Sequence, residues 1–228
     1  MSLQARVQSP SVSLDESLRG CFAMGLLEAD GVRQDPLPPE FEQELDRLTA
    51  TLVARYAGKQ PADIPGVAET RALFHRLDMD PTKTRPSSEA LLRRVLQGKG
   101  LPRVSPVVDI CNLCSVEHQL PLGLYDRDLV HGTVRVRVGR EGEGYSGIRK
   151  QRVGLVGRLL LADDQGPFGA PTSDSQRTAV SPRTGNLLVV LFCPPARAGQ
   201  HLSAALEHIA SLLTRHCSAN VVAVRVLQ

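Results

Sequence analysis

The spacing of apolar residues changes along the chain, and no other feature of the sequence constrains the fold as strongly. In most segments before residue 121, apolar residues recur every three or four positions, as on one face of an α-helix. Most later segments alternate or run continuously, as strands do. Because helices mostly come first and strands later, we expect an α+β fold without a regular β–α–β array. We expect residues 1–228 to form a single domain, which this length allows.

Capping residues set the limits of the expected helices. Ser87 is expected to be the N-cap of one helix, and Ser105, followed by Pro106 at the first helical position, the N-cap of the next. Helices are expected over residues 41–56, 65–80, 88–97, 106–118 and 199–216. Strands are expected over residues 20–32, 133–138, 158–163, 186–192 and 220–227.

Composition indicates the compartment of the protein. No run of about 18 apolar residues is present, and residues 1–13 lack the hydrophobic segment of a secretory signal. We therefore expect no membrane span and a cytoplasmic protein. The five cysteines are an odd number in a long chain, so structural disulfides are not expected. Cys21 and Cys193 lie in apolar runs and are expected to be buried free thiols.

The charged residues are distributed in blocks. The net charge is +3, but residues 71–103 carry eight basic and three acidic side chains, and residues 133–158 carry seven and two. Two basic blocks on a nearly neutral chain are typical of a surface that meets an anionic partner such as RNA. The alternative is that both blocks are ordinary solvated faces.

Motifs for metals, redox chemistry and nucleotides are weak or absent in the sequence. Cys111 and Cys114 form a Cys-x-x-Cys pair, but His118 is the only additional ligand nearby, and the pair lies inside an expected helix, so packing is the preferred interpretation. His201 and His208 share a helix face that is expected to be ordinary surface. The sequence has no phosphate-binding glycine motif, which disfavours a nucleotide enzyme.

Two polar features suggest a site. Asp109 and Asn112 are three residues apart, on one face of an expected helix, where they either converge on a common point or serve as caps and solvated groups. Residues 171–186 concentrate hydroxyl groups together with Asp174 and Arg177 between two strong strands. A connection of this length either turns the chain or lines a polar pocket, and its length favours the pocket.

The order of several dispersed motifs resembles a known family. Residues 101–128, LPRVSPVVDICNLCSVEHQLPLGLYDRD, are followed by GTVRVRVGREGE and LLLADDQG. This order is similar to that of the B3/4 editing and tRNA-binding module of the phenylalanyl-tRNA synthetase β subunit. The matching residues are Val107, Val108, Asp109, Ile110, Asn112, Pro121, Leu122 and Asp126, with Tyr125 in an aromatic position. The resemblance covers residues 71–195 and no other synthetase region, as in a free-standing copy, with residues 1–70 expected to add a strand and helices packed on it.

The resemblance implies a fold and an activity. The fold would be α+β, with mixed, largely antiparallel sheets and flanking helices. The activity would be hydrolysis of the ester that links wrongly loaded tyrosine to tRNA, with a buried acidic residue that hydrogen-bonds the phenol. Two positions depart from the family: Gly123 replaces its histidine, and the glycine-rich loop with its acidic residue is replaced by FGAPTSDSQRTAV, in which Asp174 is the nearest acid. The amino acid that is recognised is therefore left open.

The motifs and the resemblance together predict a polar pocket. Asp174 and Glu89 are the candidate catalytic residues, either of which would orient a water molecule or the α-amino group. The residues predicted to bind substrate are Arg85, Ser87, Asp109, Asn112, Thr172, Arg177 and Thr178. No metal or other cofactor is expected, because hydrolysis of an activated ester needs only a positioned water and polar groups that stabilise the oxyanion.

Contacts with tRNA or aminoacyl-tRNA are predicted beside this pocket. Arg93, Arg94, Lys99 and Arg103 would hold phosphates and position the RNA without reading its sequence. In the helix expected over residues 88–97, the side chains of Glu89, Arg93 and Arg94 are expected to point away from the core. Three functions stay open: a deacylase that acts in trans on aminoacyl-tRNA, a non-catalytic RNA- or aminoacyl-binding module, and an amino-acid-binding protein or enzyme that reuses the pocket.

Overall fold

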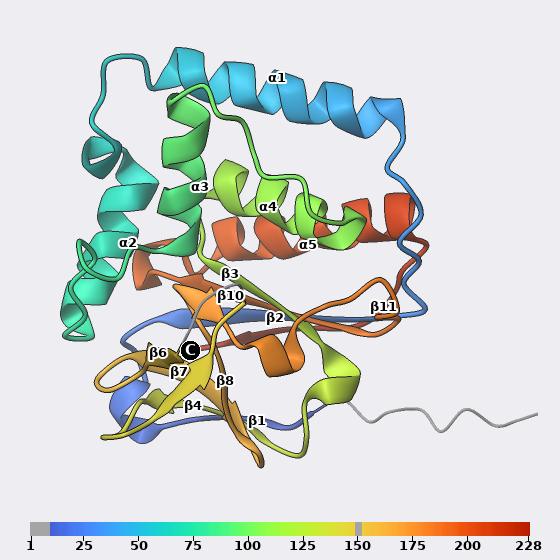
Figure 1. Cartoon of the computed structure of the whole chain (residues 1–228). Helices are drawn as coiled ribbons and strands as arrows, with labels where there is room; N and C mark the ends of the chain where they lie inside the picture. Colours follow the sequence, from blue (N-terminus) through green and yellow to red (C-terminus); the bar gives the residue numbers. More distant parts are fainter. Residues whose placement is uncertain (1–9, 149–151) are drawn as a thin grey trace, which may run out of the picture.

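The computed structural model describes residues 10–148 and 152–228 (Figure 1). The helices in this part of the chain are α1 (Pro39–Arg55), α2 (Pro65–Arg76), α3 (Ser87–Leu96), α4 (Pro106–His118) and α5 (Gln200–Cys217). The strands are β1 (Val12–Leu14), β2 (Ala23–Asp30), β3 (Leu122–Asp126), β4 (Val134–Val138), β5 (Gly144–Ser146), β6 (Arg152–Gly154), β7 (Leu159–Asp163), β8 (Gly166–Ala170), β9 (Ser173–Asp174), β10 (Leu187–Cys193) and β11 (Asn220–Leu227). Short 3₁₀ turns are η1 (Glu16–Leu18), η2 (Pro61–Asp63), η3 (Arg127–Leu129), η4 (Gln176–Thr178) and η5 (Pro195–Arg197).

The strands form two main sheets. The first has the order β11-β2-β10-β3 and is antiparallel throughout. The second has the order β1-β4-β7-β8-β9, in which only β1 and β4 pair in parallel. A small hairpin of β5 and β6 accompanies them. The α+β prediction, with mixed and largely antiparallel sheets, is confirmed.

The helices and the two sheets form three layers. Helices α1, α3, α4 and α5 cover one face of the first sheet, and the second sheet lies against its other face (Figure 1). Successive side chains of a strand point to opposite faces. Because both faces of the first sheet are covered, β2 and β10 carry apolar side chains on both sides. Side chains that face the helices are Leu27 and Ala29 of β2 and Leu187, Val189 and Leu191 of β10. Side chains that face the second sheet are Met24 and Leu26 of β2 and Leu188, Val190 and Phe192 of β10.

The helix limits follow the sequence closely, except that α2 ends at Arg76 rather than at residue 80 and that α3 differs in two ways. Pro86, rather than Ser87, is its N-cap, and Ser87 is already helical. The expected orientation of Glu89 is wrong: its side chain is 1% exposed, whereas Ala90 is exposed. At α4 the expectation is confirmed, because Ser105 is the N-cap and Pro106 occupies the first helical position. The burial of Glu89 is compensated by arginines, as described below.

The structure contains strands that the sequence patterns do not indicate. Strand β8, Gly166–Ala170, is the sequence GPFGA, whose proline and glycines normally disfavour strand interiors. It pairs with β7 through a tight turn and leads into the two-residue β9. Residues 171–186, which the sequence predicts to form a polar connection, therefore begin with the edge strand of the second sheet, β9. Asp174 lies on this strand.

The structure also tests the expectations of buried free thiols and of no membrane-spanning helix. All five cysteines are free; Cys193, Cys111 and Cys114 are buried, whereas Cys21 is only half-buried. Among the helices of the described residues, none is both long enough and apolar enough to cross a bilayer.

Candidate functional site

The N-terminus of α3, the start of β3 and the segment after β8 meet at one place. The Ser87 main-chain N–H donates to the carbonyl oxygen of Pro171 at 3.1 Å. The Ser87 hydroxyl oxygen accepts from the main-chain N–H of Leu122 at 3.3 Å. Thr172 follows Pro171 directly and is half-buried. The structure therefore places Ser87 next to the segment that carries Thr172, and both residues are among those predicted to bind substrate.

Tyr125 and Asp174 link the edges of the two sheets beside this junction. The Tyr125 hydroxyl of β3 donates to Asp174 Oδ1 of β9 at 2.6 Å. The Tyr125 ring is fully buried and packs edge-on against Phe168, with ring centroids 4.9 Å apart. Asp174 is half-buried. Asp174 is thus held in place by a buried phenol, a partner that the sequence patterns do not indicate.

The environment of Asp174 changes its acidity. Burial raises the pKa of Asp174 from its usual 3.8 to about 7, although the hydrogen bonds from Tyr125 and from the main-chain N–H groups of Leu124 and Ala170 lower it. A carboxylate has about four acceptor positions, so these three donors leave room for one more. A group with this pKa can accept or release a proton near neutral pH.

Gly123 and Gly169 make room for the Tyr125 side chain. A Cβ atom at Gly123 would lie 2.1 Å from the Tyr125 hydroxyl oxygen, and a Cβ at Gly169 would lie at the same distance. Atoms this close overlap, so neither position accepts a side chain while Tyr125 keeps this conformation. Gly123 is therefore coupled to the position of Tyr125 and through it to Asp174.

Glu89 lies at the centre of a group of arginines. It accepts two hydrogen bonds from Arg71, through Nε and Nη2, and one from Arg93 Nε, each at 2.8 Å. Arg85 Nε lies 3.6 Å away. Burial raises the pKa of Glu89, but the hydrogen bonds from Arg71 and Arg93 outweigh this effect and the net pKa is lowered. Glu89 is therefore ionised and organises three guanidinium groups, and Arg71 is a member that no local pattern indicates.

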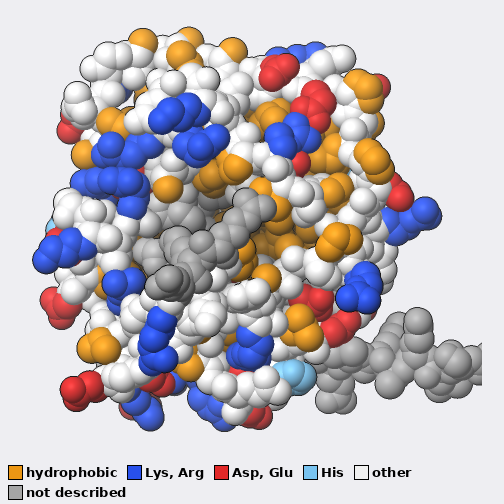
Figure 2. Space-filling view, in the orientation of Figure 1, with side chains coloured by type: hydrophobic (Ala, Val, Ile, Leu, Met, Phe, Trp, Pro, Cys, Tyr) orange, Lys and Arg blue, Asp and Glu red, His pale blue; other side chains and the backbone are white. Residues whose placement is uncertain are grey.

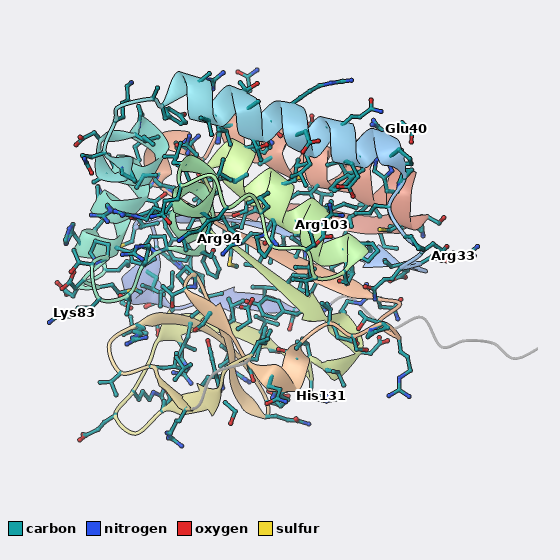
Figure 3. The ribbon with its side chains drawn as sticks, turned by 45° about the horizontal axis from the view of Figure 1, so that its top comes forward. Arg33, Glu40, Lys83, Arg94, Arg103 and His131 are labelled. Atoms are coloured by element: carbon teal, nitrogen blue, oxygen red, sulfur yellow. The ribbon has the colours of Figure 1, made fainter. Side chains whose placement is uncertain are left out.

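The predicted phosphate-binding residues lie on two elements. Arg94 and Lys99 are exposed at the end of α3, where Arg94 Nη2 donates to the carbonyl oxygen of Lys99 at 3.4 Å. Figure 3 shows Arg94 on α3 and Arg103 on the loop before α4. Figure 2 shows Lys and Arg side chains gathered at the upper left, where α2 and α3 lie in Figure 1. Arg94 and Lys99 are thus exposed basic side chains on the part of the molecule where these charges gather.

Arg103 and Asp109 are engaged with each other. Arg103 Nε donates to Asp109 Oδ2 at 2.8 Å, and Arg103 also pairs with Glu42 of α1. The other Asp109 oxygen accepts from the main-chain N–H of Val104 at 2.8 Å. Asn112 is half-buried one turn later on α4. These contacts fasten the loop before α4 to α1 and α4, so a substrate-binding role for Asp109 and an RNA-binding role for Arg103 stay predictions.

Arg177 and Thr178 lie on η4. Arg177 donates twice to Asp163, at 2.8 and 3.0 Å, and so fixes the turn between β7 and β8. Thr178 is fully buried, and its hydroxyl has no hydrogen-bond partner among the described residues. Their predicted role in substrate binding stays a prediction, and Arg177 already has a structural partner.

Comparisons with known proteins give the family. A family model described as the B3/4 domain matches residues 69–218. The phenylalanine–tRNA ligase beta subunit of Neisseria meningitidis serogroup B is 27% identical over 146 residues, which are 62% of this chain and 18% of that protein. The corresponding subunit of Streptomyces avermitilis is 37% identical over 79 residues, 34% of this chain and 10% of that protein. The chain thus spans less than a fifth of the length of these relatives.

A solved structure supports the fold. The chain is similar to an N-terminal fragment of the phenylalanyl-tRNA synthetase beta subunit from Pyrococcus horikoshii, with a TM-score of 0.50 and 13% sequence identity. The similarity covers 94% of this chain and 50% of that fragment. Because the family model matches well over half of the 228 residues, the chain belongs to the B3/4 domain family.

Proposed function

We propose that this protein binds the aminoacylated end of tRNA and hydrolyses the ester of a wrongly charged aminoacyl-tRNA in trans. The observation that carries the proposal is Asp174, a half-buried carboxyl group with a pKa of about 7, held by Tyr125 beside the N-terminus of α3. A general base acts best when its pKa lies near the working pH. The relatives that contain this module are subunits of an enzyme that charges tRNA, which supports an aminoacyl-tRNA ligand.

The proposed reaction uses water as the nucleophile. Ionised Asp174 accepts a proton as the oxygen of water bonds to the ester carbonyl carbon. Main-chain N–H groups in the first turn of α3 would stabilise the resulting oxyanion, since they have no partners within the helix. The tetrahedral intermediate then expels the ribose oxygen, which takes the proton from Asp174. The products are the free amino acid and uncharged tRNA.

The arginines around Glu89 would hold the RNA backbone. The three guanidinium groups and one carboxylate of this cluster leave two positive charges uncompensated. Glu89 occupies only Nε of Arg93, so the other N–H groups of Arg93 remain for a phosphate. Arg94 and Lys99 would extend this surface. Glu89 would then be a positioning residue, because it sets the arginines and does not touch the ester.

The proposal includes the whole chain as one cytoplasmic unit. The matched segment, residues 69–218, omits β2 and β11. Strand β2 lies between β10 and β11, and α1 contributes Phe41, which is fully buried, to the core beneath α4. Removing residues 1–70 would therefore take a central strand from the first sheet.

The test is loss of the ester from a panel of correctly and incorrectly charged tRNAs. We expect rapid loss of one wrongly charged species with the unaltered protein. Asp174→Asn should slow this loss by at least about 100-fold, since a general base contributes about 10²–10⁴-fold. Asp46→Asn is the matched control, because Asp46 is exposed on α1.

The negative outcomes distinguish the other functions. If no ester is lost but the protein still retains tRNA on a filter at low salt, hydrolysis is excluded and the function of a non-catalytic binding module remains. That function has support of its own, because Tyr125 fills the space between Gly123 and Gly169 and occupies one acceptor position of Asp174. If tRNA is neither hydrolysed nor retained, the proposed ligand is wrong and a small amino-acid ligand is indicated.

A further inference from the structure

Two histidines and a glutamate from α4 and α5 lie close together in the helical layer. His118 Nε2 at the end of α4 lies 3.1 Å from His208 Nδ1 on α5. His208 Nδ1 also lies 3.3 Å from Glu117 Oε2. All three atoms are within 4.8 Å of one another. His118 and His208 are half-buried and Glu117 is exposed, so the cluster is accessible from one side.

The spacing of these atoms is that of ligands around one metal ion. Zinc binds imidazole nitrogen at about 2.0–2.1 Å in tetrahedral geometry, which places neighbouring ligand atoms about 3.3 Å apart. The observed separations of 3.1 and 3.3 Å agree with this value. Two imidazoles and one carboxylate form a donor set that suits zinc and the neighbouring divalent transition metals.

The surroundings of the cluster also favour a cation. Glu44 of α1 lies 3.7 Å from His208 Nε2, the ring nitrogen on the far side from His118. At this distance the carboxylate does not form a hydrogen bond with the ring, but its negative charge favours a cation nearby. Metal ligation needs neutral imidazole rings, and a metal ion would replace the hydrogen bond between His118 Nε2 and His208 Nδ1.

One positive group lies close by. Arg197 contacts His201, which in turn lies 2.9 Å from the carbonyl oxygen of His118. Arg197 is itself paired with Glu69, with Nε 3.3 Å from Oε2. The remaining carboxylates, Glu44 and Glu117, carry two negative charges that a divalent cation would balance.

We propose that Glu117, His118 and His208 form a binding site for a divalent transition metal such as Zn²⁺, and that the negative charge of Glu44 beside His208 strengthens the binding. The metal would join the C-terminal end of α4 to α5. It is independent of the proposed ester hydrolysis, because none of its ligands belongs to the Asp174 site.

The test is metal binding to the full chain after treatment with a chelator. Titration calorimetry with Zn²⁺ should show one ion per chain. Separate substitutions His118→Asn and His208→Asn should each weaken binding by at least about 100-fold, and Glu44→Gln should weaken it by a smaller factor. His131→Asn is the matched control, because His131 is exposed between η3 and β4 and should leave the affinity unchanged.

A second measurement does not depend on how the variants fold. The visible spectrum of the unaltered protein with Co²⁺ should show the bands of a tetrahedral site with nitrogen and oxygen ligands. An intense sulfur-to-cobalt band would overturn the proposed ligands in favour of Cys114, the buried thiol one turn before His118. Absence of Zn²⁺ binding, or binding by the His118→Asn and His208→Asn variants that is as tight as that of the unaltered protein, would show that the histidines form only a hydrogen-bonded pair.

Discussion

Replacing Asp174 by Asn tests the physical basis of the candidate site without any substrate. The pKa of Asp174 is about 7 in the folded protein, above its usual 3.8, so the folded protein binds this proton more tightly than the unfolded chain. The contribution of Asp174 to stability is therefore fully present below about pH 4 and is lost as the pH rises to 7. Asparagine keeps the shape and the acceptor oxygen for Tyr125 but does not ionise.

The two pKa values of Asp174 give the size of this contribution to stability. One pKa unit corresponds to about 1.4 kcal/mol, so raising the pKa from 3.8 to about 7 gives a cost of roughly 4 kcal/mol for the ionised carboxylate. Asp174 is half-buried, and solvent screens part of this cost. We expect the stability of Asp174→Asn relative to the unaltered protein to rise by about 2–4 kcal/mol between pH 4 and pH 8.

Urea unfolding of both proteins at several pH values measures this difference. Other titrating groups contribute equally to both proteins and cancel in the difference. Tyr125→Phe provides a second check: the Tyr125 hydroxyl lowers the pKa of Asp174, so its removal should move the pH-dependent step upward. A stability difference that is the same at pH 5 and pH 8 would refute the argument, because it would mean that Asp174 is ionised in the folded protein at both pH values.

Three further substitutions probe the core, the glycine beside Tyr125 and the basic surface. Glu28 is fully buried and paired with two arginines, so Glu28→Ala should lower the free energy of unfolding in urea by about 3–5 kcal/mol; a loss below about 1 kcal/mol would contradict this. Gly123→Ala should cost about 1–3 kcal/mol by the same assay, and clearly less in a Tyr125→Leu background, whereas equal costs would show that Tyr125 is not the obstacle. Arg93→Ala should reduce the slope of log affinity for tRNA against log salt by about 1, and an unchanged slope would remove Arg93 from the RNA surface.

Elements with strong periodicity could be predicted from the sequence. Helix α5 has a clear apolar face, and β10 is a continuous apolar run because it is covered on both faces. Strand β8 could not be predicted, because its sequence GPFGA has the composition of a turn. Its glycine at position 169 is required by the close approach of Tyr125, a contact between residues 44 positions apart.

The candidate site was only partly predictable, for a related reason. Sequence patterns indicated Asp174 and the basic helix, but they placed Glu89 on the solvent side. Arg71, 18 residues earlier on another helix, supplies the charge that allows Glu89 to be buried. His118 and His208 are 90 residues apart and become neighbours only when α4 packs against α5. Pairings between elements carry no local signal, and these pairings define both proposed sites.

The two departures that the resemblance implies, at Gly123 and in the loop that carries Asp174, meet at Tyr125. Gly123 takes away a side chain that would point between the sheets, and the Tyr125 side chain occupies that space. The Tyr125 hydroxyl then reaches Asp174, which is the nearest acid after the family's acidic loop has been replaced. A phenol and a carboxylate of this chain thus meet where the family is expected to pair its acid with the phenol of bound tyrosine. Because the Tyr125 hydroxyl already occupies Asp174 Oδ1, the site should select less strongly for tyrosine over phenylalanine, and the panel of charged tRNAs measures this directly.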